Sequence, residues 1–253
     1  MKRTIMAVLV ATMIGFGFGA KAAELISEKD VNGKISANVG MVSEYFFRGI
    51  TQTDKKFAVQ GGLDFAHNSG IYVGAWGSNV DFNTGTEEST EVDLYGGWSG
   101  ALGKSKVTLD IGAIYYWYPG SNGPGTADYE FWEVYVGLSK DFGFASASAK
   151  VSYSPDYFGE SGDATYVELG VDVPLGKYFV LNLHGGYQWI DENATFGADD
   201  YFDYLVGLSV SAIGLDFQVA WIGTDLDDSK ENPSNSCFRT DCNAVIASVS
   251  KSF

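Results

Sequence analysis

Acidic side chains recur in the middle of short segments whose other residues are largely apolar. In YVELGVDV (166–173), Glu168 and Asp172 alternate with valine and leucine, and Asp110 and Asp216 occupy similar positions in VTLDIGAIYYWY and LDFQVAW. Successive side chains of a strand point to opposite faces, so the carboxylates share one face. Burying them in a dry core would be costly, which predicts that this face lines water. A ring of such carboxylates favours cations over anions.

Extending the alternation along the chain gives one set of inward-facing residues. The set has ten acids, two bases and one histidine, namely Glu44, Asp64, Glu91, Asp93, Asp110, Glu133, Glu168, Asp172, Asp203 and Asp216 with Arg48, Lys150 and His184. These residues could line a water-filled passage that prefers cations. Alternatively, their charges could pair and hydrogen-bond with one another in an interior filled by side chains. Two bases cannot neutralise ten acids, which favours the passage. Arg48 either contacts an anionic group of a ligand or pairs with the interior acids, and pairing is favoured.

Catalysis and metal binding have weaker support. His67 and His184 are the only histidines, and neither lies in a nucleophile motif. A lipase that uses His184 with a neighbouring serine is the enzyme alternative, but we predict no enzyme and no cofactor. TDLDDSKEN contains four acids that could gather calcium, Asp225, Asp227, Asp228 and Glu231. The segment lacks the glycine and ligand order of an EF-hand, so a solvated acidic loop is favoured and no metal site is predicted.

Twelve short alternating segments can position these side chains. They lie near 34–48, 57–66, 71–82, 90–98, 106–118, 130–140, 145–153, 165–173, 179–190, 202–211, 215–222 and 244–253. The connections between them are mostly long and short in turn, which is typical of up-and-down transmembrane barrels with external loops and periplasmic turns. The sequence therefore predicts an all-β fold, an antiparallel up-and-down transmembrane β-barrel of 12 strands.

Aromatic residues support the same fold. Several lie at segment ends beside the long connections, namely Tyr45, Trp117, Tyr153, Trp189 and Trp221. Aromatic girdles at both interfaces are typical of transmembrane barrels. The chain ends on Phe253, on the apolar side of the last segment. A terminal phenylalanine there resembles the signal by which barrel-assembly machinery recognises bacterial outer-membrane proteins.

The N-terminus predicts export. Lys2 and Arg3 precede an apolar run from residue 5 to 19, and Ala20 and Ala22 suit a cleavage site. We therefore predict a cleaved signal peptide over residues 1–22 and a barrel over residues 23–253, exported by the Sec route. The mature chain has 13 basic and 32 acidic residues, a net charge of −19 that excludes nucleic acid as a partner.

The two cysteines, Cys237 and Cys242, lie close together in SNSCFRTDC. An oxidising compartment favours a local disulfide between them. Metal binding is the alternative, but two thiols with no nearby histidine make a poor zinc site.

The segments SEYFFRGITQT and VQGGLDFAHNSGIYVGAWGSNVDF are similar to a proteobacterial family, the TorF-type porin-like proteins, also called Gcw_chp proteins. The similarity is sharpest over Ser43–Phe82 and extends loosely through Gly96–Trp98 to the C-terminus. The matching residues are Ser43, Tyr45, Arg48, Gly49, Gln60, Gly61, Asp64, His67, Gly70, Tyr72, Gly74 and Trp76. The resemblance implies a barrel in the outer membrane of a Gram-negative bacterium and says little about a substrate.

Together these features predict a porin for passive diffusion of small hydrophilic solutes through an acidic lumen. The alternative is a non-conducting structural or adhesive barrel that displays acidic external loops. The expected partners are outer-membrane lipid and lipopolysaccharide, the barrel-assembly machinery during biogenesis, and small polar solutes.

Overall fold

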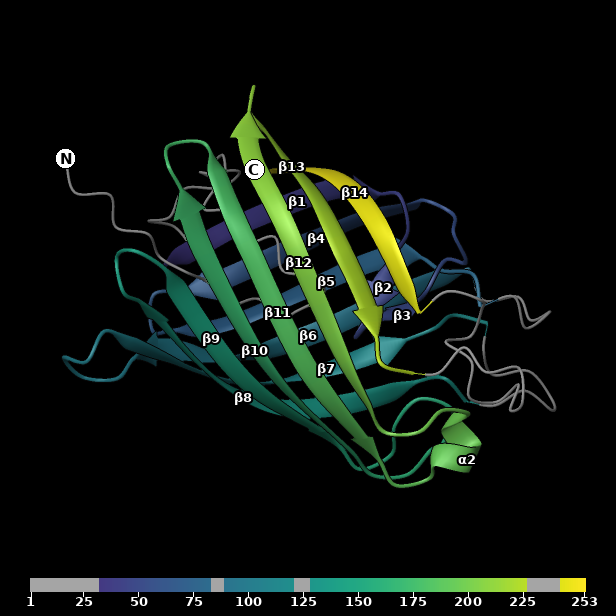
Figure 1. Cartoon of the computed structure of the whole chain (residues 1–253). Helices are drawn as coiled ribbons and strands as arrows, with labels where there is room; N and C mark the ends of the chain where they lie inside the picture. The colour runs from purple at the N-terminus through teal and green to yellow at the C-terminus, as the bar shows by residue number, and fades with distance from the viewer. Residues whose placement is uncertain (1–31, 83–88, 121–127, 227–241) are drawn as a thin grey trace.

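The computed structural model describes residues 32–82, 89–120, 128–226 and 242–253. Twelve strands form one closed antiparallel barrel (Figure 1). They are β1 (Gly33–Val42), β4 (Ala58–His67), β5 (Ile71–Asn79), β6 (Thr90–Ala101), β7 (Val107–Trp117), β8 (Phe131–Asp141), β9 (Ser146–Ser154), β10 (Ala164–Leu175), β11 (Phe179–Ile190), β12 (Tyr201–Ala212), β13 (Leu215–Thr224) and β14 (Asn243–Ser252). The prediction of an all-β, 12-stranded barrel is confirmed.

Three further elements lie outside the barrel wall. Strands β2 (Phe46–Phe47) and β3 (Ile50–Thr51) form a separate two-stranded hairpin. The single helical turn α2 (Asn193–Phe196) lies between β11 and β12. Among the described residues, no helix is both long and apolar enough to cross a membrane.

The last strand closes the barrel against the first. Strand β14 pairs with β1 from Asn38 opposite Ser252 to Val42 opposite Ser248. Phe253 extends this pairing, because its N–H donates to the carbonyl of Ala37 at 2.8 Å and its carbonyl accepts from the N–H of Ala37 at 3.3 Å. Closure leaves the wall without an unpaired sheet edge.

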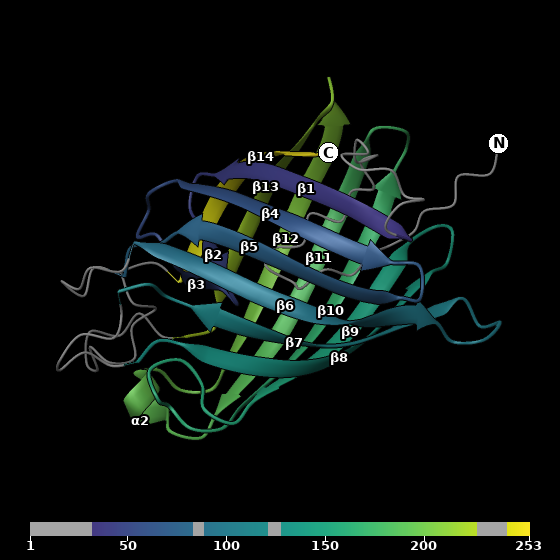
Figure 2. The same ribbon diagram turned by 180° about the vertical axis from the view of Figure 1, so that it is seen from behind.

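The two ends of the barrel differ. Short turns join the strands at one end, such as residues 68–70 between β4 and β5, and we call this the inner end. The longer connections and α2 gather at the other, the outer end, as Figures 1 and 2 show from opposite sides. The described strands therefore confirm that long and short connections are sorted to opposite ends.

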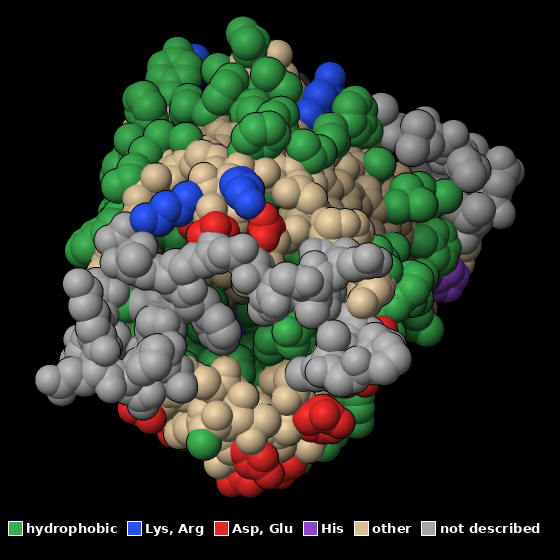
Figure 3. All heavy atoms as spheres, turned by 90° about the vertical axis from the view of Figure 1, so that its right-hand side faces the viewer, with side chains coloured by type: hydrophobic (Ala, Val, Ile, Leu, Met, Phe, Trp, Pro, Cys, Tyr) green, Lys and Arg blue, Asp and Glu red, His purple; other side chains and the backbone are tan. Residues whose placement is uncertain are grey.

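The outside of the barrel is apolar. Large hydrophobic side chains point away from the wall, with Ile111 50%, Leu169 60% and Val219 55% exposed. In the view toward the outer end, hydrophobic side chains lie along much of the circumference of the barrel (Figure 3). Trp117 and Trp189 lie at the outer ends of β7 and β11 and are 42% and 45% exposed. An apolar exterior with aromatic residues at its border is the surface of a transmembrane barrel.

The first predicted segment extends too far toward the C-terminus. Strand β1 stops at Val42 instead of continuing to Arg48. Glu44, Tyr45 and Arg48 therefore belong to the connection that follows, and Tyr45 is 1% exposed instead of facing lipid. The alternation of residue types continues past Val42, but positive φ angles at Arg48 (47°) and Gly49 (76°) turn the chain back on itself. Two such residues make the tight turn of a two-residue hairpin.

Candidate functional site

The hairpin β2–β3 is held together at its base. Phe46 pairs with Thr51, and below this pair the N–H of Gln52 donates to the carbonyl of Tyr45 at 2.7 Å. Glu44 accepts hydrogen bonds from the Thr51 hydroxyl at 2.6 Å and from the N–H of Lys55 at 3.0 Å. Glu44 therefore secures the base of the hairpin and does not line the barrel wall as the sequence predicted.

The hairpin crosses the interior of the barrel near its outer end. On one side, the Tyr45 hydroxyl donates to Glu91 of β6 at 3.2 Å. At the tip, a Cβ on Gly49 would lie 2.8 Å from the Cβ of Asp203 on β12 and 2.9 Å from the carbonyl oxygen of Gly223 on β13. Strand β6 is not adjacent to β12 or β13 in the barrel. The hairpin therefore spans between separate parts of the wall, within the outline of the barrel in both views (Figures 1 and 2).

Arg48 fixes the tip of the hairpin to the far wall. One guanidinium nitrogen donates to Glu133 of β8 at 2.7 Å, and the other donates to Gln188 of β11 at 2.7 Å. The guanidinium also lies 4.1 Å from the ring centre of Tyr166 and 4.7 Å from that of Phe47. The side chains of Arg48 and Glu133 are only 5% and 3% exposed. Pairing of Arg48 with an interior acid agrees with the interpretation that the sequence favoured.

Electrostatics keep Arg48 charged in this position. Burial alone would lower the pKa of its guanidinium, but Glu133 and the neighbouring tyrosines raise that pKa well above its ordinary value. A buried arginine with a carboxylate partner and two ring faces holds one geometry, because its planar fork matches all of these contacts.

Four predicted acids form an outer tier at the level of the hairpin: Glu91, Asp93, Glu133 and Asp203. They are between 0% and 2% exposed. Asp203 accepts hydrogen bonds from the Tyr166 hydroxyl at 2.8 Å and lies 3.0 Å from Nε2 of His184. In contrast, one oxygen of Glu91 and both oxygens of Asp93 have no hydrogen-bond partner among the described residues.

His184 contacts two polar side chains inside the barrel. Its Nε2 lies 3.0 Å from the Tyr166 hydroxyl and 3.0 Å from Asp203. Within the described part of the chain, these hydrogen bonds go to a tyrosine and a carboxylate and not to a serine.

The remaining predicted acids form an inner tier, and each has a partner in the described structure. Glu168 pairs with Lys150 at 3.0 Å. The other acids accept hydrogen bonds, Asp64 from Tyr95, Asp110 from Tyr72, Asp172 from Asn182 and Asp216 from Ser211. Asp64 and Asp172 are partly exposed, whereas Asp110 and Glu168 are 3% and 4% exposed. The sequence predicted these acids, but not which groups hold them.

Tyrosine rings occupy part of the interior beside the inner-tier acids. The hydroxyl of Tyr72 lies 2.5 Å from that of Tyr135, which comes from a strand three places along the wall. Glycines make room for these rings, since a Cβ on Gly97 would lie 2.6 Å from the Tyr72 hydroxyl and one on Gly112 would lie 2.5 Å from that of Tyr135. The interior is therefore more filled than the alternation of residue types indicated.

Sequence reasoning missed several interior contacts. Gln188 is 0% exposed and holds Arg48, and Tyr166 contacts both Arg48 and Asp203. Both lie on the inward face, which the alternation correctly indicated, but their partners come from distant strands. No local pattern identifies such partners.

Two predictions fall partly outside the described residues. Cys237 lies there, so the disulfide to Cys242 stays a prediction. Of the possible calcium ligands, Asp227, Asp228 and Glu231 also lie there, while Asp225 accepts a hydrogen bond from the N–H of Phe202 at 2.7 Å. The described residues contain no group of three side chains suited to a metal ion. Residues 1–22, the predicted signal peptide, lie outside the described part as well.

Comparison with known proteins gives a family and several distant structural likenesses. No curated protein sequence matches the chain. The outer-membrane channel DcaP of Acinetobacter baumannii is 11% identical, with a TM-score of 0.46 over 91% of this chain and 100% of that one. The COG4313 outer-membrane channel of Pseudomonas putida F1 is 11% identical, with a TM-score of 0.47 over 88% of this chain and 96% of that one. LpxR from Salmonella typhimurium is 11% identical, with a TM-score of 0.44 over 86% of this chain and 99% of that one.

The family assignment covers all of the described residues. The model of a family described as "Bacterial protein of unknown function (Gcw_chp)" matches residues 27–253, which include every strand of the barrel and the internal hairpin. The chain belongs to the Gcw_chp family of bacterial proteins.

Proposed function

We propose that the protein is a porin of the bacterial outer membrane, through which small hydrophilic solutes diffuse passively. The observation that carries the proposal is the inside-out polarity of a closed barrel. Its exterior is apolar, while nine carboxylates project inward from the wall strands. Charged groups inside a membrane are costly, and they are typical of a path for ions or polar solutes.

We further propose that the passage prefers cations. Among the described residues, the interior bases Arg48 and Lys150 pair with Glu133 and Glu168. The remaining wall carboxylates are held mainly by neutral tyrosine, asparagine and serine groups. Such a lumen attracts cations, and salt weakens that attraction over a Debye length of about 10 Å at 0.1 M.

The internal hairpin limits the size of the solutes that can pass through the barrel. It crosses the lumen at the outer tier and is fixed there by Arg48. Solutes that pass this level must move between the hairpin and the wall, so we expect permeation of ions and small solutes and exclusion of larger ones.

Conductance in a planar lipid bilayer tests the porin proposal. The purified, refolded protein should give channels whose reversal potential in a salt gradient reports cation preference, stronger at low salt. The charge variant should replace three inner-tier acids outside the ion pairs by amides, Asp64→Asn, Asp172→Asn and Asp216→Asn. These changes avoid leaving Arg48 or Lys150 without a charged partner.

The variant should retain conductance and lose part of its cation preference. A matched control is Lys104→Met, which changes an exposed charge in an inner-end turn. Anion preference of the natural protein would contradict the proposed lumen charge. Absence of any conductance from correctly folded protein would contradict the porin.

A second candidate is a non-conducting structural or adhesive barrel. The specific observation in its favour is the filled interior, where Asp93 is 0% and Glu133 2% exposed and tyrosine rings cross the lumen. This candidate predicts folded protein that gives no channels, but whose removal from cells changes adhesion or envelope integrity.

We also propose a route to the membrane and a set of partners. The chain is exported by the Sec machinery, loses residues 1–22, and is folded by the barrel-assembly machinery, with Phe253 as part of the assembly signal. In the membrane it contacts lipid and lipopolysaccharide. A disulfide between Cys237 and Cys242 is expected, and a shift of two mass units on reduction of the intact protein would test it.

A further inference from the structure

The outer end of the barrel contains a cavity of about 250 Å³. The hairpin β2–β3 contributes to its lining through Phe47 and Ile50. Residues from four different strand connections complete the lining, including Phe82, Tyr129, Phe158 and α2. We call this space the aromatic cavity. It lies on the outer side of the contacts of Arg48, because its lining comes largely from the outer-end connections.

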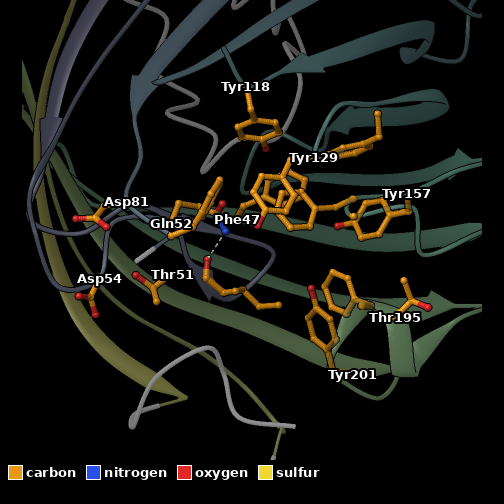
Figure 4. Close-up of a pocket in the computed structure, with 16 residues that line it drawn as sticks. Phe47, Thr51, Gln52, Asp54, Asp81, Tyr118, Tyr129, Tyr157, Thr195 and Tyr201 are labelled. Carbon is orange, nitrogen blue, oxygen red and sulfur yellow. Dashed lines mark hydrogen bonds between the residues drawn. The ribbon is translucent and has the colours of Figure 1, made fainter. Parts of the chain in front are cut away.

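Aromatic rings form one side of the aromatic cavity, as Figure 4 shows for Tyr118, Tyr129, Tyr157 and Tyr201. The rings support one another. Tyr129 and Phe158 stack with their centres 4.6 Å apart and their planes 5° from parallel. Phe82 packs edge-on against both, with centres 5.7 and 5.6 Å away. Rings that are already packed against each other offer a preformed surface, so little order has to be imposed when a ligand binds.

The opposite side of the aromatic cavity is polar and acidic. Thr51, Gln52, Asp54 and Asp81 lie there (Figure 4). Asp81 is paired with Lys56, and its N–H donates to the carbonyl of Gln52 at 2.8 Å. The described lining residues include no lysine and no arginine. This side offers oxygen atoms that can accept hydrogen bonds from a ligand, and an anionic group such as a carboxylate has no hydrogen to donate to them.

We propose that the aromatic cavity binds a single-ring aromatic molecule that is uncharged or cationic. Its ring would stack among the aromatic side chains, in the offset or edge-to-face geometries that such rings prefer. A hydroxyl or ammonium group would face Asp54 and Asp81. The size is suitable, because a cavity of about 150 Å³ is enough to hold benzene. The proposal names a solute class for the proposed porin and rests on that function only for the idea that bound solutes go on to permeate.

Binding to the full-length protein in lipid nanodiscs tests the proposal without requiring conduction. Phenol, benzylamine and benzoate serve as probes, with methyl glucoside as a ring-shaped molecule without an aromatic face. Calorimetric titration against protein nanodiscs, corrected with empty nanodiscs, separates saturable binding from partition into lipid. We expect saturable binding of phenol and benzylamine, and weaker binding of benzoate and methyl glucoside.

Two substitutions identify the site. Phe158→Leu keeps an apolar side chain but removes the ring that stacks on Tyr129, so affinity for phenol should fall roughly two- to tenfold. Asp81→Asn should weaken benzylamine relative to benzoate. The matched control is Phe144→Leu, which removes an equivalent ring from an inner-end turn where it is 76% exposed, and it should leave binding unchanged. Heat-modifiable migration on gels verifies folding, and Phe82→Leu replaces Phe158→Leu if the latter fails to fold.

Saturable phenol binding that Phe158→Leu weakens and Phe144→Leu does not would support the site. No saturable binding of either aromatic probe, equal binding of benzoate, or equal effects of the two substitutions would overturn it. Each of these results is independent of conductance, so failure of the site and failure of the porin proposal are distinguishable.

Discussion

Replacing Arg48 by methionine tests whether the hairpin is fixed by its buried ion pair. Arg48→Met keeps a long side chain but removes the charge that meets Glu133 at 2.7 Å. Both partners are at least 95% shielded from solvent. Removing one member of such a pair leaves an uncompensated buried charge, which costs about 3–5 kcal/mol. The free energy of unfolding should fall by that amount.

The double variant separates loss of the pair from loss of packing. Glu133→Gln in the Arg48→Met background removes the stranded charge and leaves an amide that needs only neutral hydrogen bonds. It should recover roughly 1–3 kcal/mol relative to Arg48→Met alone. Urea titration of the protein in lipid vesicles, followed by tryptophan fluorescence, measures all three free energies. Lys104→Met is the control, because Lys104 is exposed in an inner-end turn.

The same variants have a functional readout. Without its contacts to β8 and β11, the hairpin tip is no longer fixed across the lumen, so single-channel conductance of Arg48→Met should rise or become noisy. Equal stability of Arg48→Met and the natural protein would refute the reasoning, as would a double variant that is less stable than the single one.

Three further predictions concern other parts of the molecule. Asp93→Asn should raise the urea midpoint of unfolding, because both carboxylate oxygens of Asp93 are buried without a hydrogen-bond partner in the described part of the chain, and a lower midpoint would contradict this. Deletion of Phe253 removes two backbone hydrogen bonds to β1, so less heat-modifiable protein should be recovered from membranes, and normal recovery would contradict this. A protease site inserted at residue 232 should be cut in intact cells and one at Asn68 should not, and the reverse result would invert the assigned topology.

The barrel could be predicted from the sequence because its signals are local. Alternation of residue types has the period of a strand, and the connections differ enough in length to sort the two ends. The same signal failed after Val42, where alternation continues through Ser43 to Arg48 although the strand has ended. An Arg-Gly pair is not a usual hairpin-turn signal, since asparagine or aspartate before glycine is preferred when both residues need positive φ.

The candidate site could be predicted only as a list of inward residues. Which acid pairs with which base depends on contacts between distant strands, such as Arg48 with Glu133 and Gln188. The degree of filling depends on the match between a tyrosine on one strand and a glycine on another. Neither property has a short-range pattern, because strand order and register set both.

Because tyrosine rings packed over glycines occupy the interior, the free width of the barrel depends on side chains, whereas its closure depends on backbone pairing. The backbone ladder alone closes the cylinder, while the rings of Tyr72 and Tyr135, seated over Gly97 and Gly112, occupy its cross-section. Replacing those rings by small polar residues would widen the lumen and leave every inter-strand hydrogen bond in place. The fold is thus suited to engineering as a sensing nanopore, in which the aperture is selected by a few side chains and the cylinder that carries it is unchanged.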